Sequence, residues 1–157
     1  MGTIRVVWGT GRGPTETAAY DAALASANVH NYNLVSVSSI VPADGTVTRV
    51  ETAPDLGPAG NRLTVVQAES TIAGPGVTAA ALAWTEGDGP GLFYESAGPS
   101  DPASVEKRVR EGIEAGRALR DWPVDGVKTQ TASTEAESGE YASAVVLAVY
   151  GDSDSIW

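Results

Sequence analysis

Two adjacent serines, Ser38 and Ser39, stand inside an otherwise apolar stretch that runs from Asn33 to Pro42. The Leu, Val and Ile residues of this stretch favour a β-strand, and Pro42 ends it because proline cannot donate a hydrogen bond to a neighbouring strand. A buried hydroxyl without a partner costs about 1–3 kcal/mol. The pair therefore lies at a sheet edge or bonds to a neighbouring strand, or else it marks a peptide bond that is built to break.

The same stretch resembles the self-cleavage segment of the pyruvoyl-dependent arginine decarboxylases, through Asn33-Leu34, Ser38-Ser39-Ile40 and Pro42. Further segments match that family in the same order from about Ile4 to Tyr150, so the resemblance covers nearly the whole chain. The ordered set, rather than any one short motif, is specific. These segments are Gly9-Thr10-Gly11, Pro14-Thr15-Glu16-Thr17, Asp21-Ala22-Ala23-Leu24, Gly91-Leu92-Phe93-Tyr94-Glu95 with Gly98, Glu106-Lys107-Arg108-Val109-Arg110-Glu111, and Arg120-Asp121-Trp122.

The resemblance implies that the chain makes its own cofactor and uses it to convert L-arginine to agmatine and CO2. Removing CO2 from an amino acid leaves a carbanion at Cα, and no standard side chain can absorb that charge. By resemblance, the Ser39 hydroxyl attacks the Ser38 carbonyl, and the chain splits into a β fragment, 1–38, and an α fragment, 39–157. Residue 39 then becomes a covalent pyruvoyl group, whose ketone takes up the substrate amine and whose neighbouring carbonyl accepts the electrons.

Glu95 and Asp21 are the carboxylates that the resemblance assigns to the reaction and to the substrate. Glu95 is expected to return a proton to Cα, with its pKa raised by desolvation on an apolar strand. Asp21 is expected to pair with the guanidinium of arginine, because a carboxylate can accept two hydrogen bonds from that planar group. Taken without the resemblance, each would be read as an ordinary solvent-facing carboxylate.

Asn33, His30 and Tyr32 complete the expected substrate-binding set. Asn33 matches a family residue near the pyruvoyl group and can hold a carbonyl through its amide. His30 and Tyr32 replace smaller or aliphatic residues that are common in the family beside the substrate tail, so backbone carbonyls can do the binding there. His30 is the only imidazole of the chain, but its polar connector does not favour a role as a proton shuttle.

The residues give little support to other cofactors. With no Cys and one His, the chain offers few ligands for a catalytic metal. Lys107 belongs to a helix face expected to be solvated, and Lys128 lacks a phosphate-binding context, which disfavours pyridoxal phosphate. The glycines at 9, 11 and 13 do not have the GxGxxG spacing of a dinucleotide loop. We therefore expect neither a metal nor pyridoxal phosphate.

The composition describes an acidic globular chain of 157 residues with a net charge of -10. This charge disfavours binding to nucleic acid or to an anionic membrane surface. Abundant Asp and Glu with few Lys suit a surface that stays hydrated in a salt-adapted cytosol. The chain shows no signal peptide pattern and no apolar run long enough to cross a membrane, so a cytoplasmic location is expected.

Mostly antiparallel strands and two helices are expected along one domain, 1–157. The helices run from a cap at Thr15 or Thr17 to about Ala27, and from a cap at Asp101 to about Arg120. A turn is expected at 9–14. The expected strands are 4–8, 33–42, 47–51, 62–68, 77–84, 92–96, 124–132 and 141–150.

Several of these strands are apolar on both sides, which favours two facing sheets with helices outside. The resemblance implies this four-layer αββα sandwich and a homotrimer with active sites between subunits. Two alternatives stay open: a non-catalytic acidic domain that serves as a structural or binding partner, and a pyruvoyl decarboxylase for another amino acid.

Overall fold

The computed structural model describes residues 2–157, which form two sheets and two helices. The elements follow one another as β1 (Gly2–Gly13), α1 (Glu16–Ser26), β2 (Asn33–Ser36), β3 (Ile40–Val41), β4 (Gly45–Glu51), β5 (Arg62–Ala73), β6 (Gly76–Glu86), β7 (Gly91–Gly98), α2 (Pro102–Arg117), β8 (Gly126–Ala136) and β9 (Tyr141–Tyr150). The expected α+β class is confirmed.

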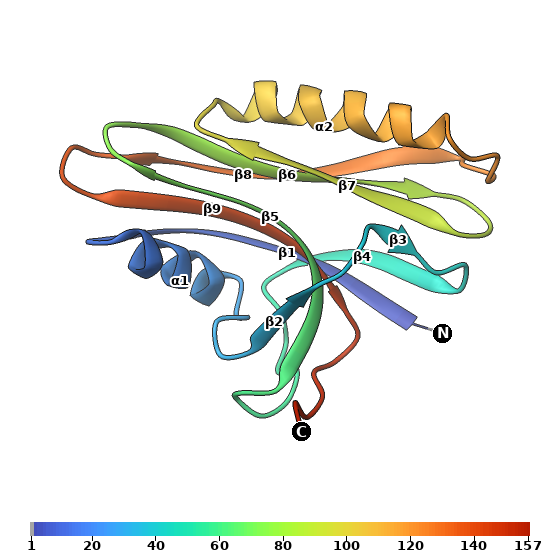
Figure 1. The fold of residues 1–157 in the computed structure, drawn as a ribbon, viewed down its shortest axis with the longest axis horizontal. Coiled ribbons are helices and arrows are strands. Elements are labelled where there is room, and N and C mark those ends of the chain that lie inside the picture. The colour runs from blue at the N-terminus through green and yellow to red at the C-terminus, as the bar shows by residue number, and fades with distance from the viewer. Residues whose placement is uncertain (1) are drawn as a thin grey trace.

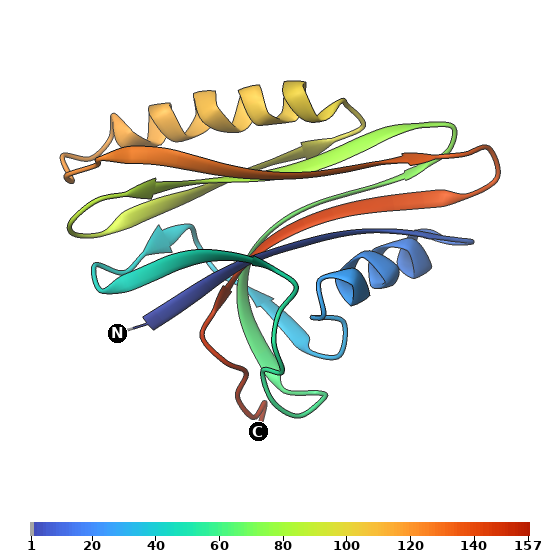
Figure 2. The same cartoon turned by 180° about the vertical axis from the view of Figure 1, so that it is seen from behind.

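The two sheets face each other, and each carries one helix on its outer face (Figure 1 and Figure 2). Sheet 1 has the strand order β2-β5-β9-β1-β4, and sheet 2 has the order β3-β7-β6-β8. The pairs β1–β4 and β2–β5 are parallel, whereas the other pairs are antiparallel. Helix α1 covers sheet 1 and α2 covers sheet 2, which confirms the four-layer αββα arrangement.

Apolar side chains fill the three spaces between these four layers. The middle space holds Leu82 and Phe93 of sheet 2 against Val146 of sheet 1. Strand β6 lies under α2 with its other face toward sheet 1, so almost all of its side chains are buried. Burial on both faces explains why an alanine-rich segment forms a strand here rather than a helix.

Both helices begin at the residues whose side chains cap them. Thr15 Oγ1 accepts a hydrogen bond from the Ala18 N–H at 3.1 Å, and Asp101 Oδ1 accepts one from the Ser104 N–H at 2.9 Å. Such caps satisfy backbone donors that have no partner within the helix. Helix α2 ends at Arg117, slightly before the expected end.

The glycines at 9, 11 and 13 extend β1 instead of forming the expected turn, which was wrong. They alternate along the strand and therefore share the face on which α1 lies. A Cβ at Gly9 would lie 2.5 Å from the Ala23 carbonyl oxygen, and one at Gly13 would lie 2.9 Å from Ala18. One at Gly11 would collide with the Ala23 backbone nitrogen. The glycines thus let the helix backbone pack directly against the strand.

Replacing Gly11 with Ala is expected to destabilise the fold by about 1–3 kcal/mol, because the added methyl group forces α1 away from β1. Gly126→Ala is the matched control, since a Cβ at this strand glycine meets nothing within 4 Å. Denaturant unfolding of the two variants measures the difference. Equal stabilities for Gly11→Ala and the wild-type chain would contradict the packing argument.

The segment 33–42 is not one strand, and that expectation was wrong. Strand β2 pairs with β5 at the edge of sheet 1, whereas β3 pairs with β7 at the edge of sheet 2. The Val37 N–H still donates to the Val65 carbonyl of β5 at 3.0 Å, but the Ser39 carbonyl already accepts from the Phe93 N–H of β7 at 2.8 Å. The serine pair therefore lies where the chain crosses from one sheet to the other.

Candidate active site

The crossing backbone forms a tight turn with Ser39 at its centre. The Ile40 N–H donates to the Ser38 carbonyl oxygen at 3.0 Å, and the Phe93 N–H donates to the Ser39 carbonyl oxygen at 2.8 Å. A donor on a carbonyl oxygen stabilises the negative charge that develops there when a nucleophile attacks the carbon. Ser38 is exposed and Ser39 is half-buried, so the pair does not lie in a dry interior.

Glu95 lies on the same strand that binds the Ser39 carbonyl. It follows Phe93 by two residues, which places its Cα about 7 Å farther along β7. Its partner across β6 is Leu82, whose side chain belongs to the core between the sheets, so the Glu95 side chain projects from that same face. Strand β3 pairs with β7 only at Gly91 and Leu92, which leaves the edge of β7 free beside Glu95.

The carboxyl group of Glu95 has a raised pKa, and the cause is desolvation by the surrounding protein. Glu95 keeps an exposed side in the single chain, yet enough water is displaced around the carboxyl group to favour its protonated form. No ion pair with Glu95 opposes this effect among residues 2–157. A carboxyl group in such surroundings can act as a proton donor.

Asp21 lies apart from the serine pair within one chain. It is exposed on α1, and α1 packs on the outer face of sheet 1. The serine turn binds β7 of sheet 2, so sheet 1 lies between Asp21 and that strand (Figure 1). One chain by itself does not bring Asp21 next to Ser39.

An acidic hollow of about 280 Å³ lies beside the same helix. Its lining includes Glu69 of β5, and Thr17 of the lining is one helical turn before Asp21. Glu16 and Asp21 of α1 and Glu69 of β5 therefore place several carboxylates within a short span beside this helix, which suits a cationic ligand. Sequence reasoning did not single out Glu69, because only the packing of α1 on β5 places it there. The full lining is Glu16, Thr17, Tyr20, Glu69 and Thr71.

Asn33, Tyr32 and His30 lie at the start of β2, on the sheet 1 side of the molecule. The Asn33 amide donates to the Gly60 carbonyl at 2.8 Å, and Asn33 is about 10 Å along the strand from Ser36. The Tyr32 hydroxyl donates to the Gly57 carbonyl at 3.0 Å. His30 is half-buried. Within residues 2–157, neither Asp21 nor any of these three residues forms a hydrogen bond with the serine turn.

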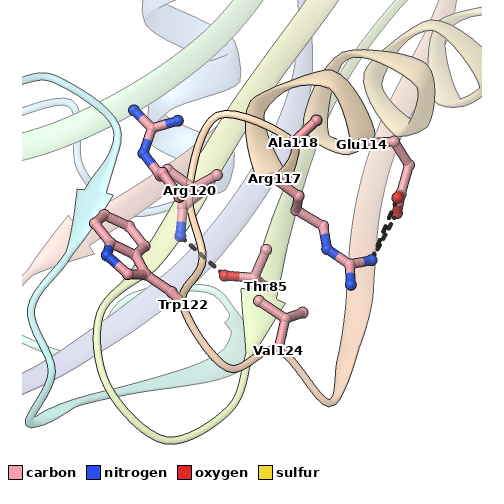
Figure 3. A pocket seen from close by; sticks show the side chains of 8 residues that line it. Thr85, Glu114, Arg117, Ala118, Arg120, Trp122 and Val124 are labelled. Atoms are coloured by element: carbon pink, nitrogen blue, oxygen red, sulfur yellow. Dashed lines mark hydrogen bonds and ion pairs between the residues drawn. The ribbon is translucent and has the colours of Figure 1, made fainter.

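A hollow of about 300 Å³ lies at the end of α2 (Figure 3), and its lining includes none of the predicted site residues. It opens on the outer face of sheet 2. Arg117 in its wall pairs with Glu114 at 3.0 Å, and the Arg120 guanidinium lies over the Trp122 ring at 5.4 Å. Two arginines make this hollow unsuited to a guanidinium substrate, because like charges repel.

Tyr150 reaches the serine turn from the other sheet, and sequence reasoning assigned it no role. Its hydroxyl donates to the Ile40 carbonyl at 2.9 Å. No local pattern pointed to this contact, because Tyr150 follows Ile40 by 110 residues and resembles any tyrosine at the end of a strand.

Residues 2–157 include no cluster of three or more His, Cys, Asp or Glu side chains placed to hold a metal ion. Neither of the helices described in this range is long and apolar enough to span a membrane.

Comparison with known proteins places the chain among enzymes. The family model for pyruvoyl-dependent arginine decarboxylase matches residues 3–155. The chain is 59% identical over 160 residues to a pyruvoyl-dependent arginine decarboxylase of Halobacterium salinarum, covering 100% of this chain and 99% of that protein. It is 32% identical to the pyruvoyl-dependent arginine decarboxylase of Methanopyrus kandleri, over 92% of this chain and 93% of that protein. It is 34% identical to the pyruvoyl-dependent arginine decarboxylase of Pyrococcus horikoshii, over 87% of this chain and 86% of that protein. The chain therefore belongs to the pyruvoyl-dependent arginine decarboxylase family.

Proposed function

We propose that this chain cleaves itself between Ser38 and Ser39 and then converts L-arginine to agmatine and CO2 in the cytosol. The observation that carries the proposal is the serine turn, in which the Ser38 carbonyl accepts a hydrogen bond and the Ser39 carbonyl binds the strand that carries Glu95, in a member of this family. Fragments 1–38 and 39–157 together form one domain in the mature protein.

The cleavage uses only the residues of the turn and one water molecule. The Ser39 Oγ attacks the Ser38 carbonyl carbon, and the peptide C–N bond breaks as the acyl group moves from nitrogen to oxygen. The Ser39 Cα then loses a proton and the Cβ–Oγ bond of residue 39 breaks, which leaves a carboxylate on Ser38 and dehydroalanine at position 39. Tautomerisation and addition of water release ammonia and leave a ketone at residue 39. The Ile40 N–H stabilises the first step by donating to the oxygen of the attacked carbonyl.

The residues around the turn fit the pyruvoyl group that results. This group supplies an electron sink for the bond from Cα to the carboxylate of the substrate. The Phe93 N–H donates to the carbonyl of residue 39, the carbonyl that lies next to the ketone in the mature chain, and so holds it in place. Glu95, whose pKa desolvation raises, returns a proton to Cα of the substrate after CO2 leaves.

A neighbouring subunit completes the site. The segment that carries the serine pair exposes apolar side chains: Val35 is 41% exposed, Val37 41% and Ile40 40%. An apolar patch of this kind marks a surface that another protein covers. In a cyclic homotrimer, the acidic face of α1 from the next subunit would cover it and bring the partner subunit's Asp21 to the guanidinium. Asn33, Tyr32 and His30 would line the same junction.

Combining two impaired variants tests this assembly. Asp21→Ala is expected to raise KM for arginine about 10- to 100-fold, since it removes a charged hydrogen-bond acceptor. Ser39→Ala keeps Asp21 but cannot form the ketone. When the two variants are coexpressed in equal amounts, about a quarter of the sites in a cyclic assembly regain both groups. Activity at low arginine should therefore return in the coexpressed protein. Variants that are purified separately and mixed without exchange of subunits should show no such recovery.

The absence of any recovery in subunits shown to have mixed would contradict a shared site. Unchanged arginine affinity in Asp21→Ala would remove Asp21 as the guanidinium partner. Assaying lysine and ornithine beside arginine separates a decarboxylase for another amino acid from the proposed one.

A denaturing gel with intact-mass analysis tests the proposed function as a whole. Two fragments that meet at Ser38 and Ser39, whose masses sum to that of the chain plus water minus ammonia, support a self-processing pyruvoyl enzyme, and agmatine formed from arginine by this protein supports the proposed reaction. One intact chain that produces no agmatine supports the alternative of a non-catalytic acidic domain.

A further inference from the structure

We propose that Tyr150 is a positioning residue for self-cleavage, which holds Ile40 so that the Ile40 N–H stays on the Ser38 carbonyl while the Ser39 hydroxyl attacks. The inference rests on the proposed cleavage between Ser38 and Ser39. It concerns a contact between the two sheets, made by a residue outside the turn itself.

The contact spans the space between the sheets. Tyr150 is the last residue of β9 in sheet 1, and Ile40 is the first residue of β3 in sheet 2. The Tyr150 hydroxyl donates to the Ile40 carbonyl at 2.9 Å. The Tyr150 ring packs edge-on against the buried Phe93 ring, with 6.2 Å between the centroids. The ring thus has a fixed support, and its hydroxyl has one defined acceptor.

Three successive carbonyl groups of the turn are each held by a different donor. The Ser38 carbonyl accepts from Ile40 and the Ser39 carbonyl accepts from Phe93. The Ile40 carbonyl accepts from Tyr150. The bond from the Ile40 N–H to the Ser38 carbonyl is made within the turn. The bonds from Phe93 and Tyr150 connect the turn to the two sheets. Ile40 therefore supplies the N–H that polarises the attacked carbonyl, while its own carbonyl is anchored from the opposite sheet.

Strand β3 alone is a weak anchor for this geometry. It consists of two residues, Ile40 and Val41, at the edge of sheet 2, and Ile40 is 40% exposed. Without the Tyr150 hydroxyl, Ile40 can rotate about its backbone bonds and move its N–H away from the Ser38 carbonyl. Misplacement of a catalytic donor by about 1 Å can slow a reaction by about 100-fold.

The tyrosine hydroxyl is a hydrogen-bond donor at neutral pH. Desolvation raises the pKa of Tyr150 to about 12, so the hydroxyl keeps its proton at neutral pH. Because Ile40 accepts this bond through a backbone carbonyl, no substitution at position 40 can remove the acceptor. The contact is therefore tested from the tyrosine side.

Tyr150→Phe removes the hydroxyl and keeps the ring against Phe93. Tyr141→Phe is the matched control, because Tyr141 occupies the other end of β9 and pairs with Gly13 and Ala73, far from the serine turn. Each chain is synthesised in a cell-free system, and the fraction cleaved is followed on a denaturing gel. We expect cleavage of Tyr150→Phe to be about 10- to 100-fold slower than cleavage of the wild-type chain and of Tyr141→Phe.

Thermal unfolding of the uncut chains separates positioning from general damage. To compare uncut chains, all three proteins carry Ser39→Ala in this measurement. The inference is supported if the three proteins unfold at the same midpoint temperature while Tyr150→Phe is cleaved slowly. The inference is overturned if cleavage slows equally in Tyr150→Phe and Tyr141→Phe. It is also overturned if cleavage of Tyr150→Phe decreases only in step with a lower midpoint of thermal unfolding.

Hydroxylamine identifies the step at which Tyr150 acts. It cleaves esters much faster than amides, so it releases fragment 1–38 only from chains in which the acyl group has already moved to the Ser39 oxygen. We expect cleavage of Tyr150→Phe to remain slow in the presence of hydroxylamine. Restoration of the wild-type rate would show that the acyl shift is intact, and would overturn the inference. If the wild-type chain is cleaved and Tyr150→Phe is cleaved at the same rate, this inference alone is overturned. If the wild-type chain stays uncut, the proposed function is overturned as well.

Discussion

Ser39→Ala is expected to yield one uncut chain of 157 residues that forms no agmatine. The substitution removes the hydroxyl that attacks the Ser38 carbonyl, and no other nucleophile occupies its place in the turn. The backbone bonds of the turn do not use the Ser39 side chain, since the Ser39 carbonyl accepts from Phe93. The stability of the fold should therefore change by no more than about 0.5 kcal/mol.

Ser38→Ala is the matched control for this experiment. It removes a neighbouring hydroxyl but keeps the carbonyl group that is attacked, because that carbonyl belongs to the backbone. Intact mass should show two fragments for Ser38→Ala and one chain for Ser39→Ala. Cleavage of Ser39→Ala at this bond would contradict the proposed chemistry, and so would agmatine formation by the uncut chain.

Glu95→Gln is expected to cleave normally and to lose about 100- to 10,000-fold in kcat, the usual contribution of a positioned proton donor. Glutamine has nearly the same shape as glutamic acid but no acidic proton. Glu111→Gln is the control, because Glu111 is exposed on α2 and lies away from the serine turn. Stopped-time assays of agmatine on fully cleaved protein separate turnover from maturation. A normal kcat in Glu95→Gln would remove Glu95 as the donor.

The pH dependence of kcat gives the same assignment a second test. The donor must be protonated, and desolvation raises the pKa of Glu95 above its ordinary value. Turnover should therefore be high below this raised pKa and fall as the pH increases through it. In Glu95→Gln the residual turnover should lose this alkaline decrease, because the group that titrates is absent.

The helices and the long strands were predictable because their signals are local. Thr15 and Asp101 cap the helices as expected, and the apolar face of α2 is buried where the spacing of Val105, Val109 and Ile113 placed it. Strand β9 begins and ends at the predicted residues, Tyr141–Tyr150, because polar residues bound an apolar run. These elements depend on periodicity and capping, which neighbouring residues determine.

The serine segment was predicted as one strand because Leu, Val and Ile residues, which favour β structure, lie on both sides of the serine pair. Which sheet each half joins depends on β5 and β7, whose positions no residue of the segment reveals. Glycines at 9, 11 and 13 were similarly taken for a turn, since only the close approach of α1 explains them as strand residues. Both errors arose where tertiary packing, rather than local preference, decides the structure.

The candidate site was predictable only in part for the same reason. Ser38, Ser39 and Glu95 were assigned through the resemblance and remain a prediction; the pairing of β3 with β7 places the serine turn and Glu95 along one strand edge. The separation of Asp21 from this group follows from the layer order, which pattern reasoning about α1 could not supply. Tyr150 was missed because its contact joins opposite ends of the chain.

The position of β1 has a consequence for the mature protein. This strand lies between β9 and β4 inside sheet 1, and its pairing with β9 runs from Ile4–Tyr150 to Gly13–Tyr141. The proposed scission after residue 38 would assign β1 and its neighbours β9 and β4 to different polypeptides, so the small fragment could not diffuse away while the sheet persists. Once denatured, however, the two pieces must find each other again in solution. Recovery then becomes a second-order event that dilution slows, whereas the newborn chain folds as a single molecule.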